Sequence, residues 1–222
     1  MQTLNTDRHL AAGRRAIGWK IGLTSLAVQA QLGVDQPDFG ILFADTEALD
    51  DLAVPITGLL QPRVEAEVAF VLDADLTDGP VTAVDVVRAT AFVLPAIEIV
   101  ASRVAGWDIT IVDTVADNAS AGAYVIGYTP VPLSAVDLRA VEMTMNGPNG
   151  VVSTGTGAAC LSHPVNAVVW LANTMARLGT PLRAGDLVLS GALGPMVSVE
   201  PGACYEATLT GLGSVRARFS EV

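Results

Sequence analysis

Two glutamates separated by a single residue, Glu65 and Glu67, give the strongest indication of chemistry in the sequence. They lie in residues 64–72, a run rich in apolar and β-branched residues that is typical of a strand. Side chains two positions apart on a strand point to the same face. We therefore expect the two carboxylates to be neighbours at the end of an apolar stripe.

Glu98 adds a third carboxylate, within the apolar residues 93–100. Carboxylates about 7 Å apart on a strand repel by roughly 2–3 kcal/mol at an effective dielectric of 20, and partial burial would also cost them solvation. Three hard oxygen ligands suit Mg²⁺ or Mn²⁺ with open water positions. The sequence thus predicts a metal site at Glu65, Glu67 and Glu98. The alternative is a set of solvated glutamates on a sheet face.

Lys20 is the single lysine of the chain, beside eleven arginines, and lies in the apolar, glycine-bounded residues 17–23. A lysine desolvated there would have a lowered pKa and could serve as an acid or base. The local sequence favours the alternative, a lysine on a strand edge whose ammonium reaches solvent. Because the only histidines are His9 and His163, proton transfer would fall to carboxylates, Lys20 or water.

The elements that must position these groups are mostly short strands. Strands are expected at residues 64–72, 96–100, 124–128, 187–190, 196–199, 205–209 and 215–219, with a hairpin over 142–152. Capping residues and apolar stripes predict helices after Thr82 and over residues 164–178, a short helix over 24–33 and a helical turn over 113–121. Strands outnumber helices without regular alternation, which predicts an α+β fold with a mixed, curled sheet.

The length of residues 1–222 fits one large domain or two tightly merged halves, with 51% apolar residues and two cysteines that make no disulfide framework. Only 16% of residues are charged, so we expect surface hidden in a homo-oligomer. The net charge of −11 argues against nucleic acid and anionic membranes as partners. No signal peptide or apolar span is evident, which predicts a cytoplasmic protein.

Five longer runs carry a family resemblance. They are GWKIGLT at residues 18–24, QLGVDQPDFG at 31–40, QPRVEAE at 61–67, DTVADNAS at 113–120 and SGALGPM at 190–196. Together they resemble the 2-keto-4-pentenoate hydratases, within the fumarylacetoacetate hydrolase superfamily, from about residue 13 to the C-terminus. Members of that family usually carry a further, largely helical N-terminal segment, so we expect a catalytic domain without this segment.

The resemblance implies a β-rich mixed fold of the superfamily's C-terminal-domain type, with Mg²⁺ or Mn²⁺ held by the three glutamates. It also implies that Lys20 is an acid or base, that Asp38 is its acidic partner, and that Ser120 lies near the substrate. From the local sequence, Asp38 would be a turn aspartate and Ser120 a hydroxyl at a helix end.

The implied activity is hydration of 2-hydroxypenta-2,4-dienoate to 4-hydroxy-2-oxopentanoate in aromatic catabolism, with an aldolase or decarboxylase as a pathway partner. Lys20 and Asp38 would move the proton. One alternative is a related decarboxylase acting on 2-oxo-3-hexenedioate, although residues 190–196 resemble the hydratases better. The other is a catalytically silent subunit that assembles but does no chemistry.

Overall fold

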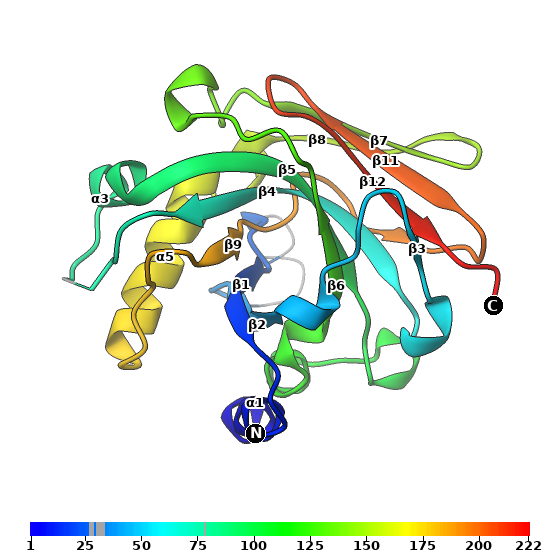
Figure 1. Cartoon of the computed structure of the whole chain (residues 1–222), viewed down its shortest axis with the longest axis horizontal. Helices are drawn as coiled ribbons and strands as arrows, with labels where there is room; N and C mark the ends of the chain where they lie inside the picture. The colour runs from blue at the N-terminus through cyan, green and yellow to red at the C-terminus, as the bar shows by residue number, and fades with distance from the viewer. Residues whose placement is uncertain (27–28, 30–33, 78) are drawn as a thin grey trace.

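The computed structural model describes residues 1–26, 29, 34–77 and 79–222, in which two β-sheets are packed together (Figure 1). The first sheet has seven strands in the order β2-β1-β9-β4-β5-β6, with β10 paired to β4. These strands are β1 (Ala16–Gly22), β2 (Asp38–Phe43), β4 (Arg63–Leu72), β5 (Thr90–Val100), β6 (Ala121–Ile126), β9 (Leu187–Leu189) and β10 (Val197–Ser198).

The second sheet has five strands in the order β3-β12-β11-β7-β8. They are β3 (Ala53–Val54), β7 (Glu142–Gly147), β8 (Gly150–Thr156), β11 (Cys204–Leu209) and β12 (Gly213–Phe219). The strand pairs β1–β9 and β3–β12 are parallel, and the other pairs of named strands are antiparallel. The predicted α+β fold with mixed, curled sheets is therefore confirmed.

The named α-helices of the described residues are short apart from one. They are α1 (Gln2–Ala11), α3 (Ala83–Ala89), α4 (Ile111–Ala116) and α5 (Pro164–Arg177). Single 3₁₀ turns form η1 (Ala44–Thr46), η2 (Ile56–Gly58), η3 (Ala105–Trp107), η4 (Asn118–Ser120), η5 (Leu133–Ala135) and η6 (Gly157–Ala159). No helix in the described ranges is long and apolar enough to cross a membrane.

Several local predictions are confirmed. Thr82 and Asp85 form the expected capping box of α3, and Pro164 is the first residue of α5. The hairpin is present as β7 and β8. The expected short helix over 24–33 falls largely on residues 27–28 and 30–33, outside the described residues.

The predicted start of the second acidic strand after Pro95 is wrong, because β5 begins at Thr90 and passes through this proline. The carbonyl of Pro95 accepts a hydrogen bond from the backbone N–H of Gly127, 2.8 Å away, on the β6 side. The missing N–H of the proline therefore falls at the end of the β6 ladder and leaves the β4–β5 ladder intact.

The two faces of the first sheet contribute to two different apolar clusters. Alternate residues of β4, beginning with Val64 and ending with Leu72, belong to a large core shared with α5 and the second sheet. In Figure 1, α5 and the second sheet flank the long strands β4 and β5. On the inner, concave face a second, smaller apolar cluster forms around Tyr124. Glu65, Glu67 and Glu98 share this inner face, so the curl of the sheet surrounds them.

Candidate active site

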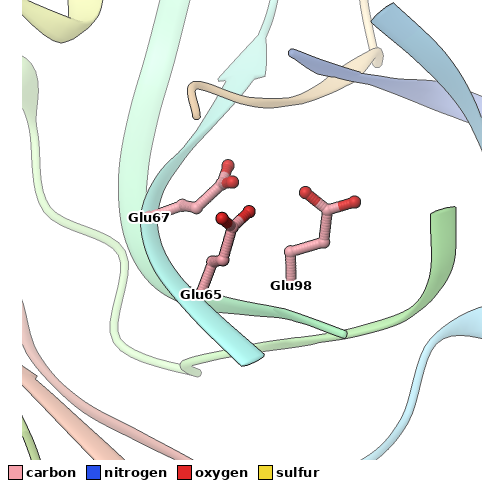
Figure 2. A group of neighbouring side chains, drawn as sticks. All are labelled: Glu65, Glu67 and Glu98. Atoms are coloured by element: carbon pink, nitrogen blue, oxygen red, sulfur yellow. The ribbon is translucent and has the colours of Figure 1, made fainter. Parts of the chain in front are cut away.

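The three glutamates converge through strand alternation and strand register. Glu65 and Glu67 are two positions apart on β4, and Glu98 lies directly opposite Glu65 on β5. Each residue offers a carboxylate oxygen, and these oxygens all lie within 4.8 Å of one another. Figure 2 shows the three carboxylates facing one another. The structure therefore brings together all three residues that the sequence proposed as metal ligands, and their role as ligands stays a prediction.

These carboxylates are withdrawn from water and short of partners. Glu67 is 0% exposed and Glu98 is 1% exposed, and Glu65 is partly buried. Among the described residues, the buried side-chain oxygens that lack a hydrogen-bond partner are Asp38 Oδ1, Glu67 Oε1 and both oxygens of Glu98, although Glu98 Oε1 forms an ion pair with Lys20. Buried carboxylate oxygens without partners are costly unless a proton or a cation neutralises them. The donor set therefore fits a hard divalent cation.

Lys20 lies on β1 and is buried, with 3% of its surface exposed. Its Nζ donates a hydrogen bond to the carbonyl of Ala119 at 2.9 Å and lies 3.1 Å from Glu98 Oε1. The alternative of a lysine that reaches solvent is therefore wrong. The side chain of Lys20 points to the concave side of the curled sheet, where its ammonium lies among carboxylates and pairs with Glu98.

The predicted direction of the Lys20 pKa shift is also wrong. Burial alone would lower the pKa of Lys20, but the charge of Glu98, followed by those of Asp38, Glu65 and Glu67, outweighs it and raises the pKa above its ordinary value. These charges favour the ammonium form of Lys20, so the side chain is better suited to stabilising negative charge than to removing a proton.

The same environment also raises the pKa values of the three glutamates, for which a raised pKa favours the neutral form. Burial, with the charge of Glu98, raises the pKa of Glu65 to about 7. Burial, with the charges of Glu98 and Glu65, raises the pKa of Glu67 well above its ordinary value. Burial also raises the pKa of Glu98, although Lys20 opposes the shift. The cluster therefore resists full ionisation unless further positive charge is present.

Asp38 is the first residue of β2 and lies opposite Gly22 of β1, so the alternative of a turn aspartate is wrong. It is buried, with Oδ1 unpartnered. A Cβ added to Gly22 would lie 2.2 Å from Asp38 Oδ1 and 3.4 Å from Lys20 Nζ. The absence of a side chain at Gly22 thus leaves space in which Asp38 and Lys20 approach each other, as the family resemblance implies for an acid–base pair.

Ser120 is the last residue of η4 and is buried. Its hydroxyl lies 3.5 Å from the hydroxyl of Thr114, and the preceding residue, Ala119, provides the carbonyl that receives Lys20. The structure thus places Ser120 one residue from a contact of Lys20, at the end of a 3₁₀ turn as the local sequence suggested. Its contact with substrate stays a prediction.

Two residues near the site were given no role by the sequence. The backbone N–H of Gly191 donates a 2.8 Å hydrogen bond to Glu67 Oε2. Gly191 has φ +103°, and a Cβ there would lie 2.3 Å from Thr24 Oγ1, so glycine is required for this approach. The run SGALGPM contains this glycine, but only the fold reveals that its amide meets Glu67. The second residue is Asn118, which joins η4 to β2.

The comparisons with known proteins agree with this architecture. Residues 19–220 match the family described as fumarylacetoacetate (FAA) hydrolase C-terminal. The chain belongs to the fumarylacetoacetate hydrolase family. This confirms the superfamily that the sequence runs indicated and explains the curled, β-rich fold.

Two relatives of known name are similar to this chain over nearly its whole length. The chain is 56% identical over 219 residues to a 2-keto-4-pentenoate hydratase of Paraburkholderia xenovorans (strain LB400), covering 99% of this chain and 81% of the relative. It is 45% identical over 213 residues to a 2-hydroxyhexa-2,4-dienoate hydratase of Comamonas testosteroni, covering 95% and 81%. The resemblance to the hydratases is therefore confirmed.

A solved structure of the same family is a decarboxylase. The 4-oxalocrotonate decarboxylase from Pseudomonas putida G7, complexed with magnesium and adipate, superimposes with a TM-score of 0.95 at 36% identity. The match covers 98% of this chain and 83% of that one. The same scaffold is thus found in a decarboxylase as well as in the hydratase relatives.

Proposed function

We propose that this chain is a metal-dependent hydratase that converts 2-hydroxypenta-2,4-dienoate into 4-hydroxy-2-oxopentanoate. The observation that carries the proposal is the buried cluster of three carboxylates with Lys20 against it, in a chain 56% identical to a protein named as such a hydratase. A catalytically silent subunit would have no need to bury unpartnered acids, which are costly to the fold.

Glu65, Glu67 and Glu98 would hold Mg²⁺ or Mn²⁺, since their unpartnered oxygens fit a small dication and magnesium is present in the related decarboxylase structure. When bound, the cation would supply Lewis-acid stabilisation to the negative charge that develops on the 2-oxo acid head of the substrate. The amide of Gly191 orients Glu67 for this purpose.

Lys20 and Asp38 would move the protons. In the first step the 2-hydroxyl of the dienol loses its proton and C5 gains one, giving an unsaturated 2-oxo acid. Asp38 suits the accepting role because its Oδ1 is buried and unpartnered, and Lys20 would supply the other proton from its place beside Glu98. Water then adds at C4, and a proton is delivered to C3.

The runner-up is a decarboxylase of 2-oxo-3-hexenedioate, which the close superposition on 4-oxalocrotonate decarboxylase favours. The two reactions change substrate mass in opposite directions, because hydration gains one water and decarboxylation loses CO₂. Mass spectrometry of the products from the dienol and from the diacid therefore separates them.

The test of the proposal is turnover of enzymatically generated dienol with and without EDTA. We expect water gain that stops on chelation and returns with added Mg²⁺ or Mn²⁺. Turnover unchanged by EDTA would remove the metal from the scheme. Loss of CO₂ without water gain would favour the decarboxylase, and a folded, metal-binding protein without turnover of either substrate would favour the silent subunit.

The proposal also covers the oligomeric state of the enzyme, its location in the cell and its pathway partner. The low charged fraction of 16% supports a homo-oligomer, which sedimentation of the purified protein tests. A cytoplasmic location and a pathway partner that consumes the hydroxy acid, such as an aldolase, follow from the proposed reaction in aromatic catabolism.

A further inference from the structure

Asn118 connects the two edges of the first sheet. β2 lies at one end of the strand order and β6 at the other, and Asn118 belongs to η4, immediately before β6. Its side chain accepts a hydrogen bond from the backbone N–H of Ile41 at 2.8 Å and donates one to the carbonyl of Ile41 at 3.0 Å. This pair of bonds, the Asn118 clamp, holds η4 against β2 across the opening of the curled sheet.

The clamp holds a turn of unusual backbone conformation. Asn118, Ala119 and Ser120 have φ values of 57°, 52° and 55°, so three successive non-glycine residues occupy the left-handed region. Such residues are disfavoured singly and persist only where surrounding contacts determine them. Here the conformation directs the carbonyl of Ala119 at Lys20 Nζ, 2.9 Å away.

The turn also packs on the backbone of β2 next to Lys20. A Cβ added to Gly40 would lie 2.3 Å from the carbonyl oxygen of Asn118, so backbone meets backbone at this point. Gly40 is the register partner of Lys20, and the same strand begins at Asp38. The turn, Lys20 and Asp38 therefore form one connected unit whose geometry depends on the contact between η4 and β2.

We propose that Asn118 is a positioning residue that holds Lys20 and Asp38 in their working geometry by joining η4 to β2. The expected effect on turnover rests on the proposed function. The effect on the position of Lys20 and Asp38 does not. Asn118 makes none of its described contacts with the glutamates. Its loss should therefore disturb the acid–base pair and leave the metal ligands on β4 and β5 in place.

The fold offers a matched control for a general loss of stability. Asn173 on α5 makes the same two hydrogen bonds with one residue, accepting from the N–H of Val81 at 2.9 Å and donating to its carbonyl at 2.9 Å. Both asparagines are partly buried, and both partners are buried. N173A therefore removes the corresponding pair of bonds to Val81, with one further bond to the carbonyl of Val169, and none of these described contacts involves Lys20 or Asp38.

The experiment compares N118A, N118G and N173A in the full chain. We expect N118A to lower kcat on the order of 100-fold, the scale of a misplaced catalytic group, with KM and Mg²⁺ affinity within about twofold of wild type. We expect N173A to lower the melting temperature comparably with kcat within about twofold. N118G relieves the left-handed strain but lacks the clamp, so we expect the same loss as N118A.

A second readout does not depend on activity. Because Lys20 is the only lysine, ¹⁵N-lysine labelling gives a single side-chain ammonium signal in the Mg²⁺-loaded protein. We expect N118A and N118G to shift or broaden this signal, and N173A to leave it unchanged. If N118A fails to fold, N118D, which keeps the acceptor oxygen and loses the donor, serves in its place with a smaller change in the same direction.

The outcomes are distinguishable from failure of the proposed function. A wild-type protein without hydratase turnover overturns the proposed function, and the ammonium signal then decides the role of Asn118. Wild-type kcat and an unchanged signal in N118A overturn the positioning role. Rescue by N118G to wild-type values also overturns it, because the clamp would then be dispensable.

Discussion

Glu65 and Glu98 lie directly opposite each other on the antiparallel strands β4 and β5. Like charges at opposing positions of a sheet destabilise it, and here Glu67 adds a third acid within 4.8 Å. Lys20 compensates one of them, through its contact of 3.1 Å with Glu98. Two negative charges therefore remain to be neutralised, by protons or by a dication.

The first prediction concerns the metal. Glu67 is fully buried with Oε1 unpartnered, so E67Q removes a charge from the centre of the cluster while keeping the volume. We expect Mg²⁺ and Mn²⁺ affinity, measured by calorimetry, to fall by more than the roughly 10–100-fold typical when a hydrogen-bond partner of a metal ligand is removed, with turnover lost in parallel. E206Q, at a surface acid paired with Arg216, should change neither. Equal metal affinity in E67Q and wild type would contradict the site.

The second prediction concerns pH. Because burial raises the pKa of Glu65 from 4.5 to about 7, the metal-free folded state binds this proton more tightly than the unfolded state. The stabilisation is complete below about pH 4.5 and is lost as the pH rises to about 7. A dication replaces the proton, so added Mn²⁺ should raise the melting temperature more at pH 8 than at pH 5.5.

E65Q is the control for this linkage. It carries no titrating proton at position 65, so the melting temperature of the metal-free variant should vary less between pH 5.5 and 8 than that of wild type. The increase on adding Mn²⁺ should also shrink. A wild-type response to Mn²⁺ that is the same at both pH values would argue against neutralisation of Glu65 by the metal.

The third prediction separates Lys20 from the metal. K20M removes the ammonium beside Glu98, and we expect turnover to fall on the order of 10²–10⁴-fold, as for loss of a general acid. Metal affinity should be retained or increased, because a cation close to the bound dication is removed. K20R keeps the charge but not the shape of the donor and should recover little turnover. Parallel loss of metal binding and turnover in K20M would instead indicate a structural role.

The fourth prediction concerns the space that Asp38 occupies. G22A places a methyl group 2.2 Å from the present position of Asp38 Oδ1, so the carboxylate must move. We expect kcat to fall about 10–100-fold with the fold intact. G58A adds a methyl group where nothing lies within 4 Å and should leave kcat unchanged. Unaltered kinetics of G22A would exclude Asp38 from proton transfer.

The sequence by itself determined what depends on local periodicity and capping. The two-residue period of a strand placed Glu65 and Glu67 on one face, and the Thr82–Asp85 capping box and Pro164 marked two helix starts. Five sequence runs in a fixed order also indicated the family to which the chain belongs. The structure agrees with these predictions because they depend on residues only a few positions apart, whose relative geometry is the same in any strand or helix.

The tertiary structure decided what depends on residues far apart in the chain. The register between β4 and β5 brought Glu98 to Glu65, and the clamp from Asn118 to Ile41 spans 77 positions. Local sequence favoured a solvent-exposed Lys20, but the curl of the sheet buries it among carboxylates from three other strands, which reverses the expected pKa shift. Electrostatic interactions depend on distance in space, and the fold alone sets those distances.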